Sequence, residues 1–177
     1  MIVRPLKSKA KISLKSKTDA LIESGHVLGW REWVSLPDFD VPLIKAKVDT
    51  GARTSSLHAL DVKVVTKDGG KFVKFVLPHY RGDGHPRVKC EAPLVDIREI
   101  RSSNGETDER IVISTHIGIG AHHLKVEMTL ANRSLMGFPM LLGRTAMKAG
   151  RFLVLPTKSY LAGQAETVYT AGKSDVE

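Results

Sequence analysis

Residues 43–52 have the sequence LIKAKVDTGA, and this stretch decides the fold. As far as Val48, apolar side chains alternate with lysines, a period of two residues that predicts a β-strand with one buried face. Asp49 follows where the alternation ends, so its carboxylate can be held by the amide groups of a loop. Thr50 offers a hydroxyl that can brace this loop, and Gly51 allows the backbone to come close to the carboxylate. The pattern therefore predicts a strand that ends in a chemically usable carboxylate.

A second apolar run lies downstream at residues 138–144, with the sequence FPMLLGR. Within it, residues 140–142 predict a short buried strand that ends at Gly143. Residues 144–149 then predict one or two helical turns, which end at Gly150. A short strand followed by a short helix is thus expected near the end of the chain.

The rest of the chain consists of short strand-like runs separated by turn signals, which is typical of an all-β domain. Hairpin turns are expected at residues 67–70, with the sequence KDGG, and at residues 102–106, with the sequence SSNGE. The remaining expected strands cover residues 28–36, 61–66, 71–77, 94–101, 109–117, 124–130 and 152–155, the last of which closes the sheet.

Length and charge suggest one domain with two polar ends. The 177 residues divide into a basic, flexible leader (1–26) with one short helix near residues 19–24, a β domain (27–162) and a polar tail (163–177). The formal net charge is +8, but the first 20 residues carry six basic side chains against one acid, so contact with nucleic acid through the leader is a weak alternative. No stretch has the roughly 18 apolar residues of a membrane helix. The single cysteine, Cys90, favours a reducing, cytoplasmic location.

Three motifs together resemble one bacterial group, the ATP-dependent zinc protease family of retropepsin-like proteins. They are LGWRE at residues 28–32, KAKVDTGARTSSLH at residues 45–58 and MLLGR at residues 140–144. The resemblance covers about residues 27–160. It implies a retropepsin-like β-barrel of the pepsin-type acid protease class, in which residues 43–48 and 140–142 are neighbours. Members of the family are often encoded with RimK-type ATP-grasp glutamate ligases, which implies a functional link to such a ligase.

The resemblance also implies an aspartic peptidase site. The catalytic residues would be Asp49, Thr50 and Gly51, and the substrate-binding residues would be Ala52, Arg53, Ser103, Asn104, Gly105 and Arg144, with residues 102–106 as the tip of a mobile flap. Such a peptidase needs two carboxylates that share one proton. Because the chain has one Asp-Thr-Gly motif, we expect a homodimer that contributes two copies of Asp49. The alternatives are a monomer in which another acid, such as Asp96, is the second carboxylate, or a chain with no second acid at all.

Arg53 departs from the pattern of the retroviral proteases. There the residue four positions after the catalytic aspartate is another aspartate, which pairs with the arginine of the Gly-Arg motif. In this sequence Arg53 and Arg144 would repel one another. We therefore expect Arg144 to find a different partner, either Asp96 or a carboxylate of the substrate.

Metal chemistry is the competing interpretation of the site. The candidate ligands are His58, His79, His85, Cys90, His116, His122 and His123. None forms a compact pair of the kind that structural zinc sites use, and adjacent histidines in a strand point to opposite faces. The sequence contains neither a phosphate-binding Walker A loop nor a His-Glu-x-x-His motif. We predict no metal and no cofactor.

Three functions remain open from the sequence. The first is a peptidase that acts on a peptide or protein, with acidic or glutamate-modified tails as substrates. That substrate class follows from the family's association with glutamate ligases, and the positive charges of Lys47, Arg53, Arg101 and Arg144 suit it. The second is a zinc-dependent hydrolase. The third is a non-catalytic binding module on the same fold, since a fold does not determine a function.

Overall fold

The computed structural model of the protein describes residues 19–78, 87–101 and 107–163. The expected flap tip, the loop with His79 and His85, most of the basic leader and most of the C-terminal tail lie outside these ranges. Before the first strand, residues 19–23 are helical, as expected. No helix in the described ranges is long and apolar enough to cross a membrane.

Nine strands form one sheet, and a second sheet has two strands. The elements in chain order are β1 (Val27–Leu28), β2 (Arg31–Leu36), η1 (Pro37–Phe39), β3 (Val41–Val48), β4 (Ser55–His58), β5 (Leu60–Lys67), β6 (Gly70–Leu77), β7 (Val88–Arg101), β8 (Thr107–Ile119), β9 (His122–Ala131), β10 (Met140–Leu142), α2 (Arg144–Ala149) and β11 (Leu153–Val154).

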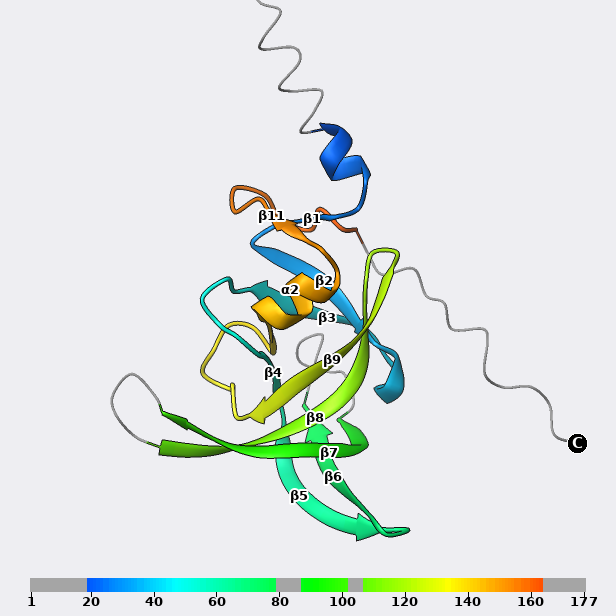
Figure 1. Ribbon diagram of the computed structural model, residues 1–177, viewed down its shortest axis with the longest axis vertical. Coiled ribbons are helices and arrows are strands. Elements are labelled where there is room, and N and C mark those ends of the chain that lie inside the picture. Colours follow the sequence, from blue (N-terminus) through cyan, green and yellow to red (C-terminus); the bar gives the residue numbers. More distant parts are fainter. Residues whose placement is uncertain (1–18, 79–86, 102–106, 164–177) are drawn as a thin grey trace, which may run out of the picture.

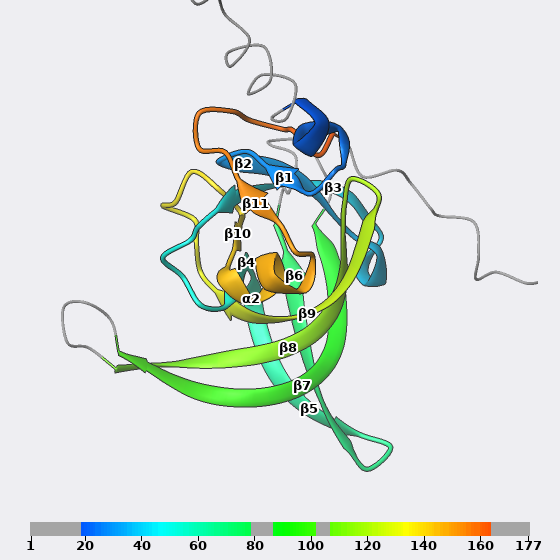
Figure 2. The ribbon, with the colours of Figure 1, turned by 45° about the horizontal axis from the view of Figure 1, so that its top comes forward.

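The large sheet closes on itself into a six-stranded barrel (Figure 1). Its strand order is β2-β3-β10-β4-β9-β8-β7-β6-β5, and an additional pairing joins β2 to β8 at Ser35 and Gly118. Strands β7, β6 and β5 continue the sheet beyond the barrel, and the long β7–β8 hairpin extends away from it (Figure 2). The prediction of an all-β, acid-protease-type barrel with one short C-terminal helix is confirmed.

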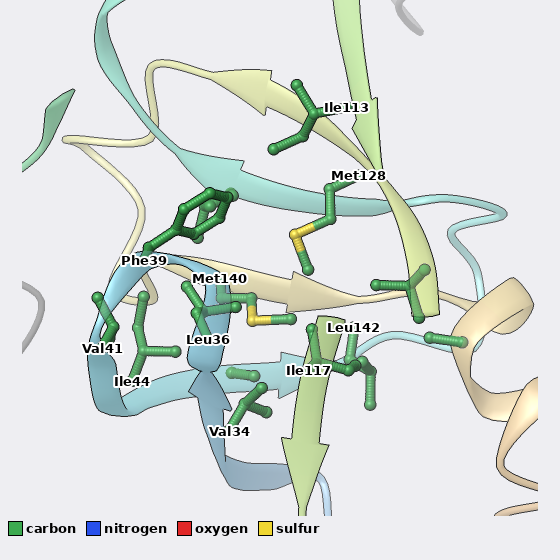
Figure 3. Close-up of a cluster of buried hydrophobic side chains, with 14 of the residues drawn as sticks. Val34, Leu36, Phe39, Val41, Ile44, Ile113, Ile117, Met128, Met140 and Leu142 are labelled. Atoms are coloured by element: carbon green, nitrogen blue, oxygen red, sulfur yellow. The ribbon is translucent and has the colours of Figure 1, made fainter. Parts of the chain in front are cut away.

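Alternation along the strands fills the barrel with apolar side chains. In β3, Ile44, Ala46 and Val48 are buried while Lys45 and Lys47 are exposed, as the sequence pattern predicts. Figure 3 shows the resulting cluster, to which almost every barrel strand contributes: Val34, Leu36, Phe39, Val41, Ile44, Ile113, Ile117, Met128, Met140 and Leu142. This core fixes the positions of β3 and β10, the two strands that lead into the site.

The pairing of β3 with β10 confirms the most specific prediction about the fold. The two strands run parallel, with Met140 opposite Ala46 and Leu142 opposite Val48. The backbone N–H of Asp49 donates to the carbonyl oxygen of Leu142 at 3.0 Å, so the pairing continues to the candidate carboxylate.

Two expectations about the strands were wrong. The run at residues 28–36 is interrupted at Gly29, where a Cβ atom would lie 2.4 Å from the carbonyl oxygen of Lys158, so only glycine fits beside that segment. Residues 152–155 do not close the main sheet, because β11 pairs in parallel with β1 in the separate two-stranded sheet. Strand β4 was not expected at all. Its Ser55 and Ser56 are polar but buried, and this hides the strand from a hydrophobic pattern.

A fully buried carboxylate, Glu32, ties the barrel to the segment that follows β11. Its Oε1 accepts hydrogen bonds from the backbone N–H groups of Gly29 at 2.6 Å and Leu161 at 2.9 Å, and its Oε2 accepts one from Ala162 at 3.3 Å. Burial raises the pKa of Glu32 above its ordinary value, although these three hydrogen bonds lower it.

The substitution Glu32→Ala is expected to lower the free energy of unfolding by about 3 kcal/mol, because three N–H groups lose their acceptor. Denaturant unfolding measures this, with Glu23→Ala, a change at an exposed glutamate, as the matched control.

The stability of the protein should also depend on pH through Glu32, because the folded chain holds the Glu32 proton more tightly than the unfolded chain does. The stabilisation that comes from this tighter proton binding is full below pH 4.5 and is lost as the pH rises through the raised pKa of the folded state. Wild type should lose stability relative to Glu32→Gln over that window, and a constant difference would contradict the pKa shift.

Candidate active site

The end of β3 places Asp49 in a tight loop that holds one of its two carboxylate oxygens. Oδ1 accepts hydrogen bonds from the backbone N–H groups of Gly51 at 2.9 Å and Ala52 at 3.2 Å. A Cβ atom at Gly51 would lie 3.1 Å from the same oxygen, so a side chain there would crowd the carboxylate. Within the described residues, Oδ2 has no hydrogen-bond partner. The carboxylate is thus oriented by the backbone and keeps one oxygen for chemistry.

Arg144, the first residue of α2, braces this loop from the other side. Its guanidinium donates from one nitrogen to the carbonyl oxygens of Thr50 at 2.9 Å and Gly51 at 2.8 Å. Its backbone N–H donates to the carbonyl oxygen of Ala52 at 2.9 Å. The loop is therefore braced by Arg144, whereas the Thr50 hydroxyl makes no hydrogen bond within the described part of the chain.

Asp96 is not the partner of Arg144. It forms an ion pair with Arg98 on the same strand, with 2.8 Å between the Arg98 Nε and the Asp96 Oδ2. This hydrogen bond is the main reason that the pKa of Asp96 lies below its ordinary value. The structure therefore shows Asp96 engaged by Arg98, and the expectation that Asp96 pairs with Arg144 is wrong.

The junction between β10 and α2 is held by Ser55, a residue that the sequence patterns did not single out. The backbone N–H of Gly143 donates to the buried Ser55 Oγ at 3.1 Å, and Thr129 Oγ1 donates to the Ser55 carbonyl oxygen at 3.2 Å. A Cβ atom at Gly143 would lie only 2.6 Å from the carbonyl carbon of Thr54. The glycine is thus required for the close approach that brings Arg144 to the loop.

A groove of about 1000 Å³ begins beside this loop. Three elements contribute most of its walls: the loop after Asp49, the β7–β8 hairpin, and β9 with the residues near it. Its charged lining residues are Arg53, Arg98, Arg110, Lys125 and Arg133, against Glu99 and Glu127. The excess of positive charge makes the groove suited to an acidic ligand.

Six of the expected site residues come together here. Asp49, Thr50, Gly51, Ala52 and Arg53 form one loop, and Arg144 is hydrogen-bonded to it. The other three, Ser103, Asn104 and Gly105, lie outside the described residues. The strands on either side of them are paired as far as Arg101 and Thr107, so the expected hairpin is present up to its tip.

The metal candidates have other surroundings. Of the described residues, no group of three or more His, Cys, Asp or Glu side chains is close enough together to hold a metal ion. His122 packs against His26 and Phe152, and His116 lies 3.1 Å from an oxygen of Asp38. Burial raises the pKa of the Cys90 thiol to about 12, which suits a small buried side chain and not a nucleophile. The absence of metal remains a prediction.

Arg133, in the loop after β9, is a groove residue that sequence analysis missed. Only 8% of it is exposed, although its neighbours Asn132 and Ser134 are exposed and polar. Burial lowers the pKa of Arg133 from its ordinary value, the positive charge of Arg110 lowers it further, and the negative charge of Asp49 opposes both. Arg133 and Asp49 are therefore electrostatic neighbours.

Comparison with known proteins supplies independent information about this site. A family model described as RimB-like, "Retropepsin-like aspartic endopeptidase RimB", matches residues 27–165. This description names an aspartic endopeptidase and mentions neither zinc nor ATP. A protein from Legionella pneumophila, Lpg0085 of unknown function, has a similar solved structure with a TM-score of 0.67. It is 27% identical, and the match covers 77% of this chain and 97% of that one.

Curated relatives include proteins named probable alpha-L-glutamate ligase. The one from Shewanella halifaxensis is 43% identical over 146 residues, which is 82% of this chain and 32% of the relative. The one from Desulfotalea psychrophila is 39% identical over 138 residues, which is 78% of this chain and 30% of the relative. The chain thus spans about a third of the length of these relatives.

Proposed function

The chain belongs to the RimB-like family of retropepsin-like aspartic endopeptidases, and from this premise we propose that it is an aspartic peptidase that uses Asp49 to activate water. One observation carries the proposal. Asp49 has one oxygen held by the N–H groups of Gly51 and Ala52, while the other oxygen accepts no hydrogen bond from the described residues. A carboxylate fixed in this way can take a proton from a water molecule without losing its orientation.

The reaction requires a second carboxylate, and we propose that a second copy of the chain supplies it. The ionised Asp49 takes a proton from water, and the protonated Asp49 of the other copy donates its proton to the oxygen of the scissile carbonyl. The hydroxide that forms attacks the carbonyl carbon. When the C–N bond breaks, the leaving nitrogen receives a proton from the carboxyl that gained one, and one hydroxyl of the tetrahedral intermediate returns its proton to the other carboxylate as the carboxylic acid forms. Two-fold symmetry would bring the two loops together.

We propose acidic or glutamate-modified tails as the substrates. The positively charged lining of the groove supports this choice. The relatives named probable alpha-L-glutamate ligase support it as well, since each contains a segment similar to this chain within a longer protein. A link between this chain and a glutamate ligase follows as part of the proposal. The similarity to segments of proteins named glutamate ligases also favours a second candidate, a non-catalytic module that binds the acidic tail on which a ligase acts.

Mass spectrometry of a peptide that ends in a run of glutamates tests the proposal. Incubation with the purified protein is expected to shorten this peptide across part of the acidic-to-neutral pH range, while a matched peptide that ends in glutamines is cleaved more slowly. A zinc chelator in a parallel reaction should have no effect. Inhibition by the chelator would favour a zinc-dependent hydrolase. Binding of the peptide without any cleavage would favour the binding module.

A further inference from the structure

Arg133 is a buried cation that forms no salt bridge with an acid in the described part of the chain, although the negative charge of Asp49 acts on it from a distance. The exposed fraction of the residue is 8%. Its side chain makes one hydrogen bond there, from Nε to the carbonyl oxygen of Phe138 at 3.3 Å, and its backbone N–H donates to His58 Nδ1 at 2.9 Å. Arginine is rarely buried unless it is paired, because an uncompensated charge is costly to remove from water. The end of the guanidinium is therefore available to an acceptor from outside the chain.

The surroundings of Arg133 favour an anion as that acceptor. Arg133 lines the groove beside the Asp49 loop together with Arg53 and Lys125. Glu127, the acid of β9 in the same groove, is engaged by Arg98 at 2.8 Å. A guanidinium presents its donors as a planar fork that matches the two oxygens of a carboxylate.

We propose that Arg133 binds a carboxylate of an acidic peptide in this groove and so determines which substrates reach Asp49. The assignment rests on the proposed function for one point, that the ligand is a peptide. The groove itself supports a peptide over a nucleic acid. Among the described residues, the lining of the groove contains no aromatic side chain on which a base could stack.

Binding measurements in the Asp49→Asn background test this proposal without turnover. We expect a peptide that ends in several glutamates to bind more tightly than its glutamine counterpart. Arg133→Met, which keeps the apolar stem, should weaken binding of the glutamate peptide about 30-fold or more. It should leave unchanged the binding of a glutamine peptide with an amidated C-terminus, which has no carboxylate. Arg133→Lys keeps the charge without the fork and should give an intermediate loss. Lys148→Met, at an exposed cation of α2 that does not line the groove, is the matched control and should have no effect.

Two further peptides distinguish the sources of the carboxylate. A glutamate peptide with an amidated C-terminus retains only side-chain carboxylates, and a glutamine peptide with a free C-terminus retains only the terminal one. Dependence on Arg133 in either peptide supports the proposal and says which carboxylate is bound. A purely structural role would weaken the amidated glutamine peptide, which has no carboxylate, as much as the others in Arg133→Met, and that result would overturn the proposal. Tighter binding of a short single-stranded RNA, lost in the same variant, would also overturn it.

The outcomes separate this inference from the proposed function. If wild type never cleaves the glutamate peptide but binds it through Arg133, the peptidase proposal fails and the carboxylate site stands. If wild type cleaves the glutamate peptide and the amidated glutamine peptide at the same rate and binds them equally, the carboxylate site fails and the peptidase stands. Should Arg133→Met unfold, Arg133→Lys provides the decisive comparison between the two peptides.

Discussion

Asp49→Asn is expected to lower kcat by about a thousandfold or more, because an amide cannot take the proton of the attacking water. Asparagine has the same shape as aspartate and keeps an oxygen that can accept the hydrogen bonds from Gly51 and Ala52. The loop should therefore stay folded, and the midpoint of thermal unfolding should remain close to that of wild type. Steady-state rates on the glutamate peptide, together with thermal unfolding of both proteins, measure the two effects.

The matched control for this prediction is Asp68→Asn. Asp68 occupies a turn with a φ of 51°, a conformation that asparagine adopts readily, and it lies in the β5–β6 turn. Its substitution should change neither the rate nor the stability. If Asp49→Asn kept activity within tenfold of wild type while folding normally, another residue would have to activate the water, and the role assigned to Asp49 would be wrong.

The sequence predicted the centre of the fold well because local patterns there agree with the long-range packing. Alternation in residues 43–48 marks a half-buried strand, and the apolar residues 140–142 mark a buried one. The prediction that these two strands are neighbours in the sheet came from the resemblance to retropepsin-like proteins. Strand β4 was missed because a pair of serines in a sequence predicts an exposed surface. In the structure both are buried: Ser55 Oγ accepts a hydrogen bond from Gly143, and Ser56 lines the groove.

Arg133 could not have been found from its local sequence. It lies between polar residues in a loop, which predicts exposure. Its burial depends on His58 and Phe138, and the contact with His58 joins residues 75 positions apart. Long-range contacts of this kind leave no periodic signal.

The two arginines near the loop illustrate how one substitution changes a hydrogen-bonding scheme. An aspartate at position 53 would offer a charged acceptor to Arg144, but Arg53 offers none. Arg144 instead donates from one guanidinium nitrogen to two carbonyl oxygens, those of Thr50 and Gly51, which are neutral acceptors. The positive charges of both arginines therefore remain near Asp49, and this favours an acidic substrate over a neutral one.

Activity is expected to depend on a dimer, because each chain has one Asp-Thr-Gly motif and Asp96 is already paired with Arg98. Well below the dimer dissociation constant, each tenfold dilution should lower the activity per chain about tenfold. Sedimentation measurements over the same concentrations give the dissociation constant independently. The plot of rate against pH should be bell-shaped, because the pair of carboxylates must hold one proton between them.

Mixing wild type with Asp49→Asn provides the sharper form of this test. If every mixed dimer is inactive, an equimolar mixture should retain about a quarter of the activity of the same total amount of wild type, since about a quarter of the dimers contain two intact chains. Chains that worked alone would retain half, and their activity per chain would not change on dilution. That result would exclude a shared site and require the second acid to come from the same chain. Asp96→Asn would then be the decisive variant, because it should abolish activity only in that case.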